Sequence, residues 1–192
     1  MNFLRLWITG ITDPAQAFDE LKGKPAPAWG LAAVMIRFLF TSLTTILSLH
    51  LLDCEPFVPS YLTFLGTETY YRAEIFFLPA FGFALWLLGS ALVHLILRLS
   101  GRASDFDQIL NVVGMGMLIP MPAVWLWDWT TIALDWYKTT VMAASHAVFA
   151  LWGAMLYTIG FKKVLGLRPA LAGSLAAAIT GLYIGLAMVF IR

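Results

Sequence analysis

The chain has 192 residues, of which 60% are hydrophobic and only 12% are charged. Soluble domains average about 25% charged residues, so this composition excludes a water-soluble globular protein. The formal net charge is +1 and no basic stripe is present, so nucleic-acid binding is not indicated. The one cysteine, Cys54, cannot form an intrachain disulfide.

Five runs of apolar residues, each long enough to cross a bilayer, follow one another along the chain. A hydrocarbon core of ~30 Å needs about 20 apolar residues in a helix. The sequence therefore predicts an all-α polytopic integral membrane bundle of five transmembrane helices, with an N-terminal amphipathic surface helix. The transmembrane domain is expected over residues 25–192, with spans near residues 29–52, 74–98, 109–127, 140–161 and 169–191.

Residues 1–24 are predicted to form a cytoplasmic or interfacial segment ahead of this domain. Residues 1–10 are mostly apolar, and Arg5 can reach lipid headgroups, so they are typical of a short interfacial helix. A second helix is expected to start at Asp13-Pro14, because aspartate is a good N-cap and proline suits the first helical position. Its apolar residues fall on one side, which favours a helix along the membrane surface over one that faces only solvent.

The first span carries a polar face. The residues Arg37, Thr41, Thr44, Thr45 and Ser48 fall on one side of a helix. A polar face turned toward lipid is costly, so we expect it to face other helices or a polar cavity. Two interpretations of Arg37 stay open: its side chain snorkels to the headgroups, or it faces the bundle interior. The candidate intramembrane polar residues are Arg37, Thr41, Thr45 and His146, the last in the fourth span.

The third span carries Pro120 and Pro122 beyond its middle, and two prolines this close should bend or break the helix. In the fifth span, small residues recur every four positions: Gly173, Ala177, Gly181 and Gly185. Small residues let helix backbones approach closely in lipid. This face is therefore a candidate for packing within the chain or for a homo-oligomer contact.

The lysines and arginines indicate an orientation. One side collects Arg5, Lys22, Lys24, Arg98, Arg102, Lys162, Lys163 and Arg168, whereas the other has Arg72, Lys138 and Arg192. The positive-inside rule places the N-terminus in the cytoplasm and, with five spans, the C-terminus outside. The expected location is a multi-pass position in the cell or inner membrane.

Motifs that would indicate an enzyme are missing from the sequence. There is no H-E-x-x-H zinc motif, no P-loop and no G-x-S-x-G elbow. The histidines His50, His94 and His146 lie on different spans at different expected depths, so a shared metal site is geometrically awkward. The sequence predicts no catalytic residues, no metal and no cofactor.

The order of features resembles the Yip (Ypt/Rab-interacting protein) family, in its prokaryotic type. Asp13-Pro14 followed by Phe18 and Leu21 is similar to the family's pre-membrane element. The stretch from Arg98-Leu99-Ser100-Gly101-Arg102 to Phe106 is similar to its basic, glycine-containing turn, and the span that follows ends in proline. The resemblance implies a small, non-enzymatic membrane protein of membrane organisation, trafficking or protein-partner binding.

Two functions follow as expectations. The first is a Yip-like protein that contacts the lipid bilayer and binds protein partners, or a second copy through the fifth span. Its working surfaces would be the N-terminal helix, the turn at 98–108 and the small-residue face. The alternative is a small-solute or ion transporter or channel, or a subunit of one, that uses the polar face around Arg37.

Overall fold

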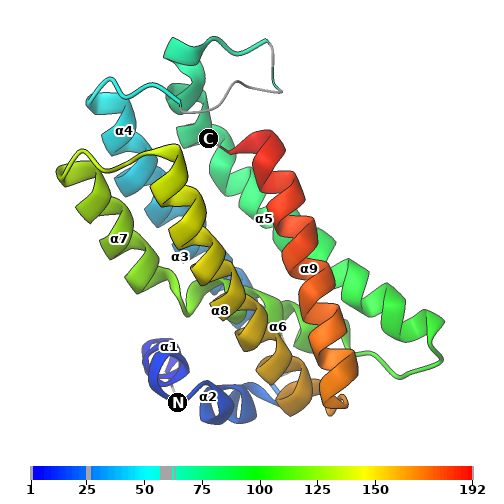
Figure 1. The fold of residues 1–192 in the computed structure, drawn as a ribbon. Coiled ribbons are helices and arrows are strands. Elements are labelled where there is room, and N and C mark those ends of the chain that lie inside the picture. Colours follow the sequence, from blue (N-terminus) through cyan, green and yellow to red (C-terminus); the bar gives the residue numbers. More distant parts are fainter. Residues whose placement is uncertain (1, 25–26, 57–61, 63, 192) are drawn as a thin grey trace.

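The computed structural model describes residues 2–24, 27–56, 62 and 64–191, and this part of the chain contains helices and no strand (Figure 1). Two short helices come first, α1 (Phe3–Thr12) and α2 (Pro14–Leu21). The longer segments follow: α3 (Ala28–Thr41) with the π-helical η1 (Ser42–Ile46) and α4 (Leu47–Leu51), α5 (Thr67–Leu99), α6 (Phe106–Leu118) with α7 (Met121–Ala133), α8 (Thr139–Leu165) and α9 (Pro169–Phe190).

Five segments are long and apolar enough to cross a membrane, which confirms the predicted fold class. They cover Ala28–Leu51, Thr67–Leu99, Phe106–Ala133, Thr139–Leu165 and Pro169–Phe190. The second span starts seven residues earlier than expected, and its 33 residues make a helix of about 50 Å. A helix of that length extends beyond a ~30 Å hydrocarbon core. The N-terminal helices and the end of α9 lie at opposite ends of the bundle, as five spans require (Figure 1).

Helix α6 forms the centre of the bundle. Every residue from Gln108 to Leu118 is buried, and α6 packs against α3, α5 and α8. In contrast, only 17% of the residues in the apolar stretch of α8 are buried, and the same share holds for α9. In the span that contains α6, 83% of the corresponding stretch is buried. The outer surfaces of α8 and α9 are therefore the surfaces that the bundle itself leaves uncovered.

Helices α3 and α6 approach each other until their backbones touch. Gly30 and Gly114 permit this approach, because a Cβ on either glycine would overlap the backbone of the opposite helix. The backbone N–H of Gly30, in the first turn of α3, donates to Oδ1 of Asn111 at 2.9 Å. An N–H in the first turn has no acceptor in its own helix, so Asn111 satisfies it inside the core.

The third span is divided into two helices, as its prolines predict. Helix α6 ends at Leu118, α7 begins at Met121, and Figure 1 shows that α7 leaves the line of α6. Pro120 and Pro122 have no N–H to donate to the carbonyls of the preceding turn. The break therefore leaves carbonyl groups of α6 free for side chains from other helices.

The two N-terminal helices pack against the membrane-spanning bundle. Asp13 caps α2 by accepting the N–H of Gln16 at 3.0 Å, as the Asp13-Pro14 pair predicts. Phe18 is 1% exposed and its ring lies against Gly160 of α8. Protein therefore covers the apolar side of α2, whereas α1 turns apolar residues outward: Leu4, Ile8 and Ile11.

Candidate functional site

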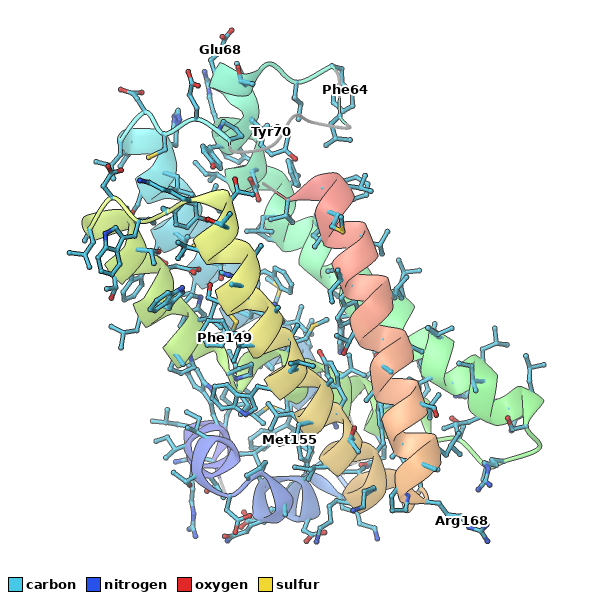
Figure 2. All side chains as sticks on the ribbon, in the orientation of Figure 1. Phe64, Glu68, Tyr70, Phe149, Met155 and Arg168 are labelled. Carbon is cyan, nitrogen blue, oxygen red and sulfur yellow. The ribbon has the colours of Figure 1, made fainter. Side chains whose placement is uncertain are left out.

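Several polar side chains of the membrane-spanning region line one cavity. It has a volume of about 230 Å³ and lies where α3, the α6–α7 break, α8 and α9 meet. Arg37 lines it from α3, Pro120 from the break, and Tyr183 from α9. Helices α8 and α9 converge at the connection that carries Arg168 and diverge toward the opposite end (Figures 1 and 2), and the cavity-lining part of α8 is the part around the labelled Phe149.

Arg37 is held in place by the break in the third span. One Nη of its guanidinium donates to the carbonyl oxygen of Met117 at 3.2 Å. The indole Nε1 of Trp7, on α1, donates to the neighbouring carbonyl of Leu118, also at 3.2 Å. The C-terminal end of a helix carries partial negative charge, so a cation is favourable there. Of the two interpretations left open, this contact is the one expected for an interior Arg37.

The rest of the Arg37 guanidinium has few partners. Arginine carries five N–H donors and stays charged in proteins, and the bond to Met117 uses one donor. Within the described residues, no carboxylate oxygen lies within 4.0 Å of this guanidinium. The group lies over the ring of Phe38, at 4.8 Å from the ring centre, and it lines the same cavity as His146, Tyr157 and Tyr183.

His146 lines the same cavity from α8 and connects it to a buried carboxylate. Its Nδ1 lies 3.0 Å from the carbonyl oxygen of Met142, which identifies Nδ1 as the donor in that contact. Its Nε2 lies 3.6 Å from Oδ1 of Asp128, whose side chain is only 6% exposed. The sequence does not mark Asp128 as a site residue, because its neighbours Trp127 and Trp129 are of the type that gathers at membrane interfaces. The sequence feature that could have revealed Asp128 is a carboxylate within an otherwise apolar span.

The threonines of the first span do not join Arg37 at the cavity. Thr41 Oγ1 accepts a hydrogen bond from Nε1 of Trp125 at 2.8 Å. Thr45 is 2% exposed and faces the core rather than the cavity. Thr44 and Ser48 donate to backbone carbonyls of their own segment. The π-helical turn adds a residue to the helical repeat here, so residues after position 41 leave the face that a regular α-helix predicts.

The small-residue face of the fifth span is turned away from the bundle. Ala177, Gly181 and Gly185 are exposed, and Gly173 is half-buried. A Cβ on any of these three glycines would meet no described atom within 4 Å. The close contacts in the bundle instead use glycines elsewhere, such as Gly82 against Phe38 and Gly116 against Tyr157. The described residues therefore contain no intrachain partner for this face.

The cavity combines a few polar side chains with an apolar lining. It offers one fixed positive charge, an imidazole and tyrosine side chains in an otherwise apolar lining. In the part of the chain that the structure describes, no three His, Cys, Asp or Glu side chains are placed to share a metal ion. Arg37 and His146 are thus the two predicted site residues that the structure brings together.

The sequence was compared with known families, curated proteins and solved structures. The family model of the Yip1 domain matches residues 9–191. No curated protein and no solved structure matches the chain. The match covers nearly the whole chain, including α2 and all five spans, and it confirms the resemblance described above. The chain therefore belongs to the Yip1 domain family of multi-pass membrane proteins.

Proposed function

We propose that this protein is non-enzymatic and binds partner proteins, in membrane organisation or trafficking, through the end of the bundle that carries α1 and α2. The observation that supports this proposal is one surface at that end, here called the basic end. It combines exposed apolar residues of α1 with exposed basic residues on α1, at the C-terminal ends of α5 and α8, and in the connections at that end. The apolar members are Leu4, Ile8 and Ile11, and the basic members are Arg5, Lys22, Arg98, Arg102, Lys162 and Arg168.

Helix α1 is well suited to present such a surface. Its outward residues Leu4 and Ile8 are 57% and 54% exposed and lie one helical turn apart. On its inner side, Leu6 is buried and Gly10 lies against Ile119 of the α6–α7 break. Because α1 is fixed to the bundle, its apolar residues are available without a cost for ordering the helix on binding.

The turn that follows α5 belongs to the same end and is also ordered by local contacts. Nδ1 of His94 lies 2.9 Å from Oγ of Ser104. Asp105 caps α6 by accepting the N–H of Gln108 at 3.2 Å. These contacts support the turn at 98–108 as a second element of the partner surface, with Arg98 and Arg102 exposed on it.

Site-specific photocrosslinking in native membranes tests the partner surface. A photoreactive residue at Ile8 and another at Arg102 should capture the same protein. The control position is Leu52, which is 61% exposed near the opposite end of the bundle. The proposal is contradicted if only the Leu52 position captures a protein. It is also contradicted if the positions at Ile8 and Arg102 capture lipid and no protein.

We also propose that the basic end faces the cytoplasm, since basic residues favour that side. Cys54 is exposed and follows α4, at the end of the bundle away from α1. A membrane-impermeant thiol reagent added to intact cells should therefore label the single cysteine. Labelling only after the cells are opened would reverse the assignment.

Transport is the second candidate function. It is favoured by the broken third span, because interrupted helices often line substrate sites in transporters, and the break here lines the Arg37 cavity. If the protein is a carrier, reconstituted vesicles should show a flux that Arg37→Leu abolishes. A flux that survives this substitution would remove the cavity from the pathway.

A further inference from the structure

The Arg37 cavity holds a positive charge for which the described residues supply no counter-ion. We propose that the cavity binds an oxyanion through Arg37. The oxyanion has two sources, the phosphate group of an anionic membrane lipid or free inorganic phosphate. The inference is independent of partner binding at the basic end, and it requires no net flux through the protein.

Arg37 carries its positive charge deep within the first span. Arg37 is the tenth residue of α3, so it lies about 14 Å along the first span. A charge at this depth is costly in lipid and is stable only with polar or ionic partners. The carbonyl of Met117 compensates part of the charge, but four of the five guanidinium donors have no protein acceptor within the described residues.

Within the described residues, no carboxylate near the cavity pairs with Arg37. The buried carboxylate of Asp128 lies at 3.6 Å from Nε2 of His146, and it makes no ion pair with Arg37. Asp128 does not line the cavity. The guanidinium is therefore free to form the paired hydrogen bonds that arginine makes with phosphate and carboxylate oxygens.

The cavity has room for a small anion and an opening through which one can enter. A volume of about 230 Å³ corresponds to roughly eight water molecules at ~30 Å³ each, enough for a small oxyanion but not for a whole lipid. The cavity is partly open, and it is lined from α8 and α9, which diverge there. Gly153 lines it without a side chain. A lipid headgroup can therefore enter the cavity while its acyl chains stay in the bilayer.

The side chains that line the cavity also favour a bound anion. Tyr157 is 4% exposed and its ring lies against Gly116, so its position is fixed by the bundle. The hydroxyl of a tyrosine can donate a hydrogen bond to an anion. His146 stands at the side of the cavity toward Asp128. The other lining residues are mainly apolar, which strengthens the attraction between Arg37 and a bound anion because the local dielectric constant is low.

The experiment uses the full chain in nanodiscs. In the lipid arm, the protein is placed in discs that contain both phosphatidylcholine and phosphatidylglycerol. Native mass spectrometry then identifies which of the two lipids stays bound to the protein. In the free-anion arm, inorganic phosphate is titrated at constant ionic strength into discs of phosphatidylcholine alone, and the thermal unfolding midpoint is followed. Retained phosphatidylglycerol identifies the lipid source, and a rising midpoint identifies the free anion.

Two variants and a control locate the binding. Arg37→Gln removes the charge and should weaken binding by about tenfold or more, because hydrogen bonds to charged groups are the stronger class. Gly153→Leu should block the cavity while Arg37 stays in place, since a Cβ there meets no described atom within 4 Å. Gly181→Leu is the matched control, because Gly181 has equally open surroundings but does not line the cavity.

The proposal is overturned if the unmodified protein binds neither phosphatidylglycerol nor phosphate selectively. It is also overturned if Gly153→Leu binds as well as the control. Should Arg37→Gln fail to yield monodisperse protein, Gly153→Leu decides alone, because it keeps Arg37 and its Cβ meets no described atom within 4 Å.

Discussion

Helix α6 and the α8–α9 pair are both apolar, but the bundle uses them in opposite ways. From Gln108 to Leu118, neighbouring helices cover every residue of α6, and two of its polar groups accept hydrogen bonds from other helices: Asn111 accepts from Gly30, and the carbonyl of Leu110 accepts from Nε1 of Trp86 at 2.7 Å. Along α8 and α9, most of the surface faces outward, and the cavity opens between them. The comparison teaches that apolar composition marks a span but does not reveal whether its surroundings are protein or lipid.

Glycine shows the same contrast at single positions. Gly30 and Gly114 sit where two backbones meet, and no larger residue fits there. Gly181 and Gly185 have open surroundings and could hold larger side chains without a clash. One residue type thus serves close packing in the centre of the bundle and leaves a smooth surface on its outside.

Gly114→Val should be the most damaging substitution. Its side chain would overlap the backbone of Gly30, and overpacking of this kind costs about 3 kcal/mol or more when neither backbone can move. Thermal or denaturant unfolding in detergent measures the loss. Gly181→Val is the control and should change stability by less than about 0.5 kcal/mol. Equal losses in the two variants would contradict the assignment of α6 to the centre.

Asn111→Leu should have the next largest effect. It leaves the N–H of Gly30 buried without its acceptor, and a buried unsatisfied donor costs about 1–3 kcal/mol. The same unfolding assay applies. Ser174→Ala is a matched loss of a polar side chain on α9, where the exposed hydroxyl bonds only to its own helix. A smaller loss for Asn111→Leu than for Ser174→Ala would show that the contact between α3 and α6 is not stabilising.

Gly185→Leu tests the outward face of the fifth span as a homo-oligomer contact. If two copies pack through this face, the bulkier side chain should separate them, because small residues set the distance between helices in lipid. Energy transfer between labelled copies in bilayers measures self-association, which should fall while stability stays within about 0.5 kcal/mol. Leu151→Ala on the exposed face of α8 is the control. Unchanged energy transfer in Gly185→Leu would remove this face as a contact.

The smallest effect is expected at Cys54. Partial burial, followed by the negative charges of Asp135 and Asp53, raises the pKa of its thiol. Because the thiolate is the reactive form, labelling should be slow at neutral pH. Its rate should still increase as the pH rises above the usual pKa of a cysteine. Asp135→Asn removes one of the charges and should speed labelling at pH 8, by less than about tenfold for a shift below one pKa unit. An unchanged rate would show that Asp135 does not influence this thiol.

Several features of this protein could be read from its sequence alone. The number of spans followed from the lengths of the apolar runs, since the thickness of the hydrocarbon core sets a minimum length for each helix. The start of α2 at Asp13-Pro14 and the break at Pro120 and Pro122 also followed. They depend on backbone donors and side-chain caps within a few residues, and such local chemistry does not need the rest of the fold.

Only the tertiary structure decided which side of each span faces protein. In water, the apolar side of a helix turns inward, but lipid is as apolar as leucine, so a span that is apolar all round carries no such signal. For that reason the sequence alone did not show that Arg37 and His146 line one cavity, that Thr41 and Thr45 lie outside it, or that Asp128 is buried beside His146. The lengths of helices are set along the chain, whereas their facing sides are set by the neighbours that the fold supplies.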